Sequence, residues 1–213
     1  MTHTRVGLVL LLALVVLAGC NAGPGDRTPE PIEVSASEAT VPAESVSGAG
    51  FSADGVEKVG VDRSGTLSIS GDVEMDLGYQ VRATGWRATY RASDSETVFG
   101  LYTVPMAEPE RVDARIDPLG DRSLSEVVAG AQTTYGDPGD LEPVQNRSVT
   151  MLETETTIQQ FAGTATRDGE TVEVTVYVAT VDHDSDRIRA VAVAPRGADD
   201  WDRLQGLFES VTH

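Results

Sequence analysis

The run TTIQQFAGTATRDGETVEVTVYVATV, residues 156–181, has the clearest structural pattern in the chain. Two segments rich in β-branched residues, 156–167 and 171–181, flank the pair Asp168-Gly169, which favours a two-residue type I′ hairpin. In the second segment the apolar positions Val172, Val174, Val176 and Val178 alternate with Thr171, Glu173, Thr175 and Tyr177. This period of two predicts a strand with one packed face, formed by the valines, and one wetter face.

More strands are expected on both sides of this hairpin. Segments rich in β-branched and aromatic residues, separated by Gly, Asp and Ser turns, are typical of β-strands. These segments are residues 55–61, 65–73, 78–91, 97–106, 149–153 and 187–194. The first four predict an antiparallel meander, so we expect an α+β domain in which helices pack on an antiparallel sheet.

The sequence predicts one helix in the first part of the domain and a second near its middle. Pro42 stands in a first-turn position of residues 40–47, which predicts one or two helical turns ending at Gly48. Ser123-Leu124-Ser125-Glu126 is a capping box, in which the serine hydroxyl and the Glu126 carboxylate satisfy backbone N–H groups of the first turn. Apolar residues at three- and four-residue steps follow it, so this second helix is expected to continue to Gly136.

A closing helix is predicted from about Asp199 to Val211. Its apolar residues form one stripe: Trp201, Leu204, Leu207, Phe208 and Val211. We expect the stripe to pack on the valine face of residues 171–181 and to bury Phe208 in the core. Under the competing interpretation the same stripe is a partner-binding face that is exposed in the monomer.

The first twenty residues indicate export. Met1 to Arg5 is short and ends on a positive charge, residues 6–18 are apolar or glycine, and Leu17-Ala18-Gly19-Cys20 resembles a lipobox. Cys20 is the only cysteine, and its thiol is expected to receive a lipid through a thioether. We therefore predict a signal peptide over residues 1–19, a flexible tether over 20–31 and one domain over 32–213. The protein is expected on the extracellular face of the cell membrane, with the membrane as its partner.

Composition limits the remaining functions. The chain has 34 acidic and 16 basic residues, a formal net charge of -18, and Lys58 is its only lysine. Removing residues 1–19 removes Arg5, which leaves 15 - 34 = -19. Such a charge excludes a general nucleic-acid binder, because phosphate recognition needs clustered Lys and Arg. Carboxylates spread along the whole chain are typical of proteins from salt-loving archaea, in which salt screens the self-repulsion.

Several short motifs support a resemblance to a known family. They are Gly78 to Tyr90 with Trp86, Asp117-Pro118-Leu119-Gly120, Gly163-Thr164-Ala165 and Phe208 to His213, together with the lipobox. The chain resembles a family of uncharacterised haloarchaeal lipoproteins over nearly all of its mature part. From Ser123 onward its order of elements is also similar to the PsbP and Mog1 type of α/β/α sandwich. Neither resemblance implies an activity or a functional residue.

Candidate sites in the sequence are few. The chain has three histidines, no cysteine pair and no P-loop, so we expect no cofactor and no catalytic residue. Asp182, Asp184 and Asp186 alternate around His183 and are a weak candidate for a cation site, and a solvated acidic hairpin turn is the favoured interpretation. Asn146-Arg147-Ser148 is a candidate glycosylation sequon.

Three classes of function stay open. A surface-tethered, non-catalytic binding or assembly module is favoured, because no catalytic constellation is present. A carrier of an apolar small molecule or lipid would need an enclosed apolar cavity. An enzyme with a carboxylate-based site would need converging carboxylates.

Overall fold

The computed structural model describes residues 30–69, 75–109, 113–136, 138–198 and 200–213. The helices and strands are β1 (Ile32–Ser35), α1 (Ala43–Gly48), β2 (Phe51–Ile69), β3 (Met75–Ala92), β4 (Val98–Pro105), α2 (Leu124–Ala131), β5 (Glu142–Met151), β6 (Thr154–Arg167), β7 (Glu170–His183), β8 (Asp186–Pro195) and α3 (Trp201–Glu209). Cys20, the expected lipid attachment site, lies outside the described residues. No helix among the described residues is long and apolar enough to cross a membrane.

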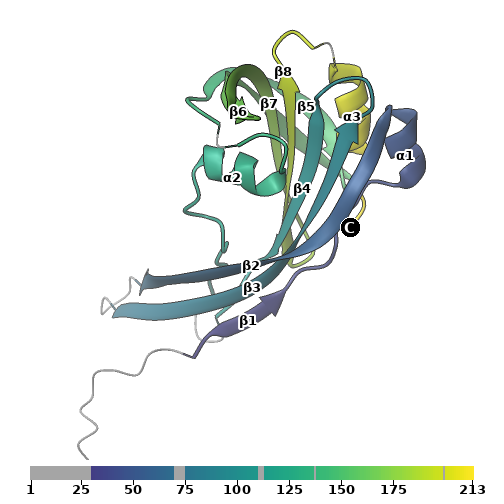
Figure 1. The fold of residues 1–213 in the computed structure, drawn as a ribbon. Coiled ribbons are helices and arrows are strands. Elements are labelled where there is room, and N and C mark those ends of the chain that lie inside the picture. Colours follow the sequence, from purple (N-terminus) through teal and green to yellow (C-terminus); the bar gives the residue numbers. More distant parts are fainter. Residues whose placement is uncertain (1–29, 70–74, 110–112, 137, 199) are drawn as a thin grey trace, which may run out of the picture.

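The strands form one open, mixed sheet built from two antiparallel meanders (Figure 1). In one meander β2 pairs with β3 and β3 with β4; in the other, β5 to β8 pair in order, and β4 pairs with β8 to join the two. The short strand β1 lies parallel to residues 81–84 of β3 and makes the sheet mixed. β2 pairs with one edge of β3, and β4 pairs with residues 86–91 on the other edge. β1 therefore lies on the same edge of β3 as β4, next to it along the strand. Beyond β1, β2 and β3 extend as a two-stranded arm.

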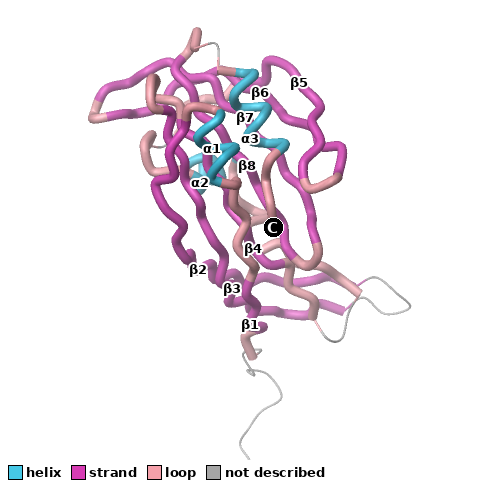
Figure 2. The backbone as a smooth tube through the Cα atoms, turned by 90° about the vertical axis from the view of Figure 1, so that its right-hand side faces the viewer, coloured by secondary structure: helices cyan, strands magenta, loops and turns pink. Residues whose placement is uncertain are grey.

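Helices lie on both faces of this sheet. Two helices, α1 and α3, lie side by side on one face, as Figure 2 shows, and α2 lies on the other. The expected sheet with packed helices is therefore present, but the helices are short and the strands long, so the fold is richer in β-structure than an α/β/α sandwich. The central strand β4 is buried along its whole length, since both of its faces are covered.

The packing of β7 differs from the expectation that α3 lies on its valine face. Val174, Val176 and Val178 pack in the core beneath α2, whereas Leu204 and Phe208 of α3 belong to the core on the opposite face. The prediction that α3 packs on the valines was therefore wrong. The face expected to be wetter is buried in its second half, where Tyr177, Ala179 and Val181 lie beneath α3. Phe208 is fully buried, as predicted.

Two boundaries also differ from the sequence pattern. Residues 55–61 and 65–73 were expected to be separate strands, but β2 runs through Gly65 without a turn. Gly65 pairs with Tyr79 across the hairpin, and a Cβ at Gly65 would lie 2.6 Å from the Tyr79 hydroxyl oxygen. The glycine therefore makes room for a cross-strand ring and does not mark a turn. Helix α2 begins at the predicted capping box, which is formed, but ends at Ala131 and not at Gly136.

The hairpin predicted at Asp168-Gly169 is confirmed. Arg167 pairs with Glu170, and Asp168 and Gly169 have φ values of 50° and 84°, as a type I′ turn requires.

A buried ionic cluster fastens the segment between β4 and α2 to the sheet. The Asp117 carboxylate accepts hydrogen bonds from Arg189 and, at 2.9 Å, from Arg187, and its other oxygen accepts the Leu119 N–H at 2.9 Å. Burial alone would raise the pKa of Asp117, but the Arg189 charge and these hydrogen bonds hold it below its ordinary value. This cluster lies on the α2 face, where Ile116 and Leu119 join the core.

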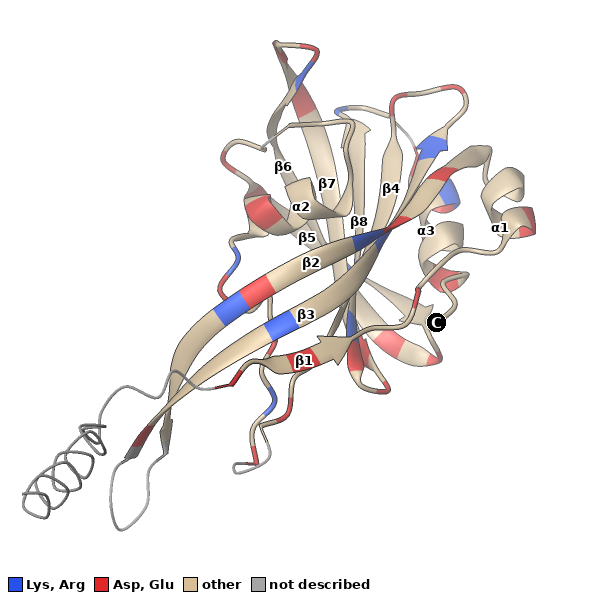
Figure 3. Cartoon of the chain, turned by 60° about the horizontal axis from the view of Figure 1, so that its bottom comes forward, with Lys and Arg blue, Asp and Glu red and all other residues tan. Residues whose placement is uncertain are grey.

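Charge is spread over the surface of the described residues. Figure 3 shows acidic residues on strands, turns and helices, as the sequence predicted. Most arginines lie beside carboxylates, for example Arg87 beside Glu57 at 2.5 Å and Arg82 beside Glu33 at 2.5 Å. Exposed pairs of this kind add little stability each.

Candidate functional site

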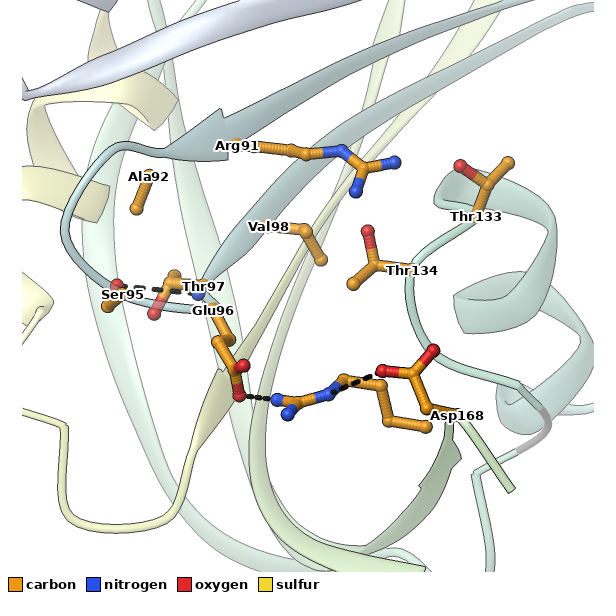
Figure 4. Close-up of a pocket in the computed structure, with 10 residues that line it drawn as sticks. Arg91, Ala92, Ser95, Glu96, Thr97, Val98, Thr133, Thr134 and Asp168 are labelled. Carbon is orange, nitrogen blue, oxygen red and sulfur yellow. Dashed lines mark hydrogen bonds and ion pairs between the residues drawn. The ribbon is translucent and has the colours of Figure 1, made fainter. Parts of the chain in front are cut away.

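A polar pocket of about 380 Å³ lies at the end of the sheet opposite to the start of β1 (Figure 1), and Figure 4 shows the residues that line it. Three segments that are distant in sequence build it: residues 91–98 at the turn between β3 and β4, residues 133–134 after α2, and residues 167–168 in the β6–β7 hairpin. The volume is in the range of small-molecule sites. The lining is mainly charged and hydroxyl-bearing, with Ala92 and Val98 as its apolar members.

The N-terminal end of α3 holds the β3–β4 turn. Asp200, which precedes α3, accepts hydrogen bonds from the Thr97 hydroxyl and, at 3.4 Å, from the Ser95 hydroxyl. Arg203 pairs with Asp200 and, at 2.9 Å, with Asp94. Burial would raise the pKa of Asp200, but the hydrogen bonds from Thr97 and Arg203 outweigh it and lower that pKa. The turn is therefore fixed to a helix and not free.

The segment after α2 is positioned by a glycine and a buried amide. A Cβ at Gly100 of β4 would lie 1.9 Å from the Ala131 carbonyl oxygen, so only glycine lets the end of α2 approach this strand. Gln132 is buried, and its Oε1 accepts the N–H groups of Thr134 at 2.8 Å and Tyr135 at 2.7 Å. These contacts place Thr133 and Thr134 at the pocket.

Tyr135 links this segment to the turn across the pocket. Its hydroxyl donates to the Glu96 carbonyl oxygen at 2.8 Å. Burial of the ring raises the pKa of Tyr135 to about 12, so the hydroxyl keeps its proton and remains a donor at neutral pH. Two of the three pocket segments are thus joined directly.

The charged groups of the pocket are arranged as ion pairs. The Arg167 guanidinium contacts the Glu96 carboxylate and lies 3.6 Å from the Asp168 carboxylate, and Arg91 binds Asp54 at 2.8 Å. Figure 4 shows Arg91 directed toward Thr133 and Thr134. Both carboxylates that line the pocket, Glu96 and Asp168, have the same arginine as partner, so the pocket offers hydrogen-bond donors and acceptors for binding.

One hydroxyl of the pocket has no partner. The Thr134 Oγ1 atom is buried and makes no hydrogen bond within the described part of the chain. Leaving a buried hydroxyl unpaired costs about 1–3 kcal/mol, so a small side-chain rotation that exposed this atom to a ligand or water in the pocket would recover that energy. None of these pocket residues was a candidate in the sequence, because they are ordinary residues of strand ends and turns, and only the fold brings the three segments together.

The sequence-predicted residues lie elsewhere. Asn146 is exposed on β5, where a glycan would find room, and its modification remains a prediction. Asp182 binds Arg187 at 2.6 and 2.8 Å, whereas Asp186 is buried and accepts the Ser37 N–H at 2.7 Å. Asp184 is exposed in the β7–β8 turn. The three carboxylates therefore have separate surroundings, and the structure does not bring them together.

Two histidines that looked unrelated in the sequence lie together at that turn. His183 Nδ1 and His213 Nδ1 are 3.0 Å apart, although the residues are 30 positions apart. No pattern in the sequence could have paired them, since His213 reaches this place only through the path of the segment after α3.

A family model described as Domain of unknown function (DUF6517) matches residues 38–212, which is most of the chain. No curated protein matches.

Proposed function

This chain belongs to the family described as Domain of unknown function (DUF6517), and we propose that it is a lipid-anchored extracellular module that binds a small polar molecule without transforming it. In this proposal the lipid is attached to Cys20 and the ligand binds in the pocket of Figure 4. The ligand is uncharged or zwitterionic and carries several hydrogen-bonding groups.

The pocket itself is the observation on which this proposal rests. Arginine donors, carboxylate acceptors and threonine hydroxyls meet within one hollow, and Thr134 Oγ1 is left unpaired there. Groups of both signs suit a ligand with donors and acceptors, such as a polyol or an amino-acid zwitterion. An apolar ligand would leave these polar groups desolvated and unpaired, so the lining argues against a carrier of apolar molecules. The paired state of Glu96 argues against an enzyme.

The position of the pocket supports an anchored receptor. β1, which follows the expected tether, begins at one end of the sheet, and the pocket lies at the other end (Figure 1). A domain held through its N-terminal side would therefore present the pocket away from the membrane. A lipid at Cys20 would provide that attachment.

The proposal also includes a halophilic archaeal source for the protein and a similarity of its fold to the PsbP and Mog1 topology. The excess of carboxylates and the single lysine support a halophilic archaeal source and argue against nucleic acid as a partner. Helices on both faces of the sheet support the similarity to the PsbP and Mog1 topology, although the sheet here is more extensive.

A binding screen tests the pocket. The full chain, purified in mild detergent and multimolar potassium chloride, is titrated with monosaccharides, polyols and amino-acid zwitterions while its melting temperature is followed. A ligand at about 100 times its Kd should stabilise the protein by about 2.7 kcal/mol, which a thermal shift detects readily. Calorimetry then gives the Kd of any ligand found.

Two threonine variants decide whether the ligand binds in this pocket. Thr134→Val removes the unpaired hydroxyl at nearly constant shape and should weaken binding, whereas Thr150→Val, at an exposed position of β5, should not. If no compound of the screen binds, or if Thr134→Val binds as tightly as the parent, the proposed function is wrong.

A further inference from the structure

We propose that His183, Asp184 and His213 form a binding site for a divalent transition metal ion, with Zn²⁺ as the reference ion. Ligand atoms of the three residues all lie within 4.8 Å of one another, the one such group of three or more found among the described residues. The site is at the β7–β8 turn, on the α1 and α3 face and at the opposite end of the sheet from the polar pocket, so it is independent of the proposed function.

The two imidazoles already have nearly the spacing that a metal requires. Their Nδ1 atoms are 3.0 Å apart, and two nitrogens bound to one tetrahedral Zn²⁺ at about 2.0–2.1 Å lie about 3.3 Å apart. A shift of a few tenths of an ångström would therefore admit the ion. The Asp184 carboxylate lies 3.7 Å from His183 Nδ1 and supplies the third ligand from the exposed side.

A buried carboxylate orients one imidazole and sets which of its nitrogens faces the other histidine. Asp186 Oδ2 lies 3.0 Å from His213 Nε2 and also accepts the Ser37 N–H. The side chains of Asp186 and His213 are each 3% exposed, so no water competes for this contact. His213 Nε2 therefore donates to the carboxylate, and in a neutral ring Nδ1 keeps its lone pair. A histidine held in this way by a carboxylate is the usual arrangement of metal-binding histidines in proteins.

The fold holds His213 in this position. Thr212 and Thr40 exchange backbone hydrogen bonds of 2.9 and 2.8 Å, and Val211 is buried just before them. His183 is held by its strand pairing with Asp186. Two ligands thus come from anchored backbone and need only a small shift, whereas Asp184 makes the larger adjustment, which reduces the entropy lost when an ion binds.

The chemistry of the donors selects the class of ion. Two imidazoles and one carboxylate suit Zn²⁺, Ni²⁺ or Cu²⁺, whereas Mg²⁺ and Ca²⁺ prefer oxygen ligands alone. Exposed carboxylates of this acidic chain will bind Mg²⁺ weakly. An excess of Mg²⁺ therefore suppresses that background without competing for the imidazoles.

Zn²⁺ titration tests the site. The full chain is prepared without a histidine tag, with Cys20→Ser in every sample so that no thiol binds metal, and is titrated by calorimetry in high salt with excess Mg²⁺. One Zn²⁺ per chain should bind. His183→Ala should reduce the affinity to the background, and Asp184→Asn should lower it about tenfold or more. In the Cys20→Ser precursor that keeps residues 1–19, His3→Ala removes the third histidine of the chain and should leave the affinity unchanged.

Electron paramagnetic resonance of bound Cu²⁺ gives a readout that does not depend on affinity. The parent should show coupling to two imidazole nitrogens, and His183→Ala should show one. The proposal is overturned if the parent binds Zn²⁺ no more tightly than His183→Ala, if His3→Ala weakens binding equally, or if Cu²⁺ shows no nitrogen coupling. The two histidines would then form only a hydrogen-bonded pair.

Discussion

Phe208→Ala should be the most damaging single truncation in α3. The Phe208 ring is fully buried and meets the Phe99 ring edge-on, with centroids 5.0 Å apart and planes at 90°. Truncating a core phenylalanine costs about 3–5 kcal/mol, and the lost aromatic contact accounts for about 0.5–1.5 kcal/mol of it. We expect a loss of about 4 kcal/mol, which is a large share of the roughly 5–15 kcal/mol that stabilises a typical domain.

Urea denaturation in multimolar potassium chloride measures this loss. With a slope of about 2 kcal/mol per M, a loss of about 4 kcal/mol lowers the midpoint by about 2 M. Val144→Ala is the control, because Val144 is 56% exposed and should change stability by less than about 0.5 kcal/mol. If Phe208→Ala unfolds at the same urea concentration as Val144→Ala, the core assignment of this stripe is refuted, and the stripe would have to act as a partner-binding face.

Three further predictions concern the anchor, the salt and the buried ionic cluster. Cys20→Ser should release the protein into the medium or leave unprocessed precursor, and unchanged detergent partitioning with unchanged mature mass would refute the lipoprotein hypothesis. The melting temperature should rise from low to multimolar salt, because the screening length falls from about 30 Å at 0.01 M to about 3 Å at 1 M; a flat or falling profile would contradict halophilic adaptation. Asp117→Asn should cost about 3–5 kcal/mol, because Arg189 stays buried without its carboxylate. Since the pKa of Asp117 is lowered in the folded protein, its contribution is present above the unfolded value near 3.8 and is lost as the pH falls through the folded value. The advantage of the parent over Asp117→Asn should therefore begin to shrink as the pH falls below about 3.8 and should disappear below the folded value, and an advantage that stays constant as the pH falls would contradict this role.

Local patterns predicted local structure well. The capping box at Ser123, the type I′ turn at Asp168-Gly169 and the burial of Phe208 all depend on residues close in sequence, and all three are confirmed. The assignment of faces failed because β7 lies inside a sheet covered on both sides. The face of β7 that begins with Thr171 and Glu173 becomes apolar from Tyr177 onward, and Ala179 and Val181 were the available signal in the sequence.

Neither candidate site could be predicted from the sequence. The pocket needs Gly100 to admit α2 and Asp200 to hold the β3–β4 turn, and both requirements are set by elements distant in the chain. The histidine pair needs the bridge between Thr40 and Thr212. The alternating aspartates, by contrast, were visible in the sequence. Adjacent positions of a strand point to opposite faces, so Asp182 lies on the other face from His183 and pairs with Arg187.

The closing segment connects both sites to the core. At its start Asp200 and Arg203 hold the turn that lines the polar pocket, and at its end His213 reaches the β7–β8 turn. Between them the buried stripe of α3 fixes the segment to the sheet, so the two ends move only if the core loosens. The stripe that dominates the sequence pattern is therefore structural, and the groups that bind are the polar residues on either side of it. A loss of packing at Phe208 should accordingly weaken both sites together, whereas Thr134→Val and His183→Ala should each affect one site alone.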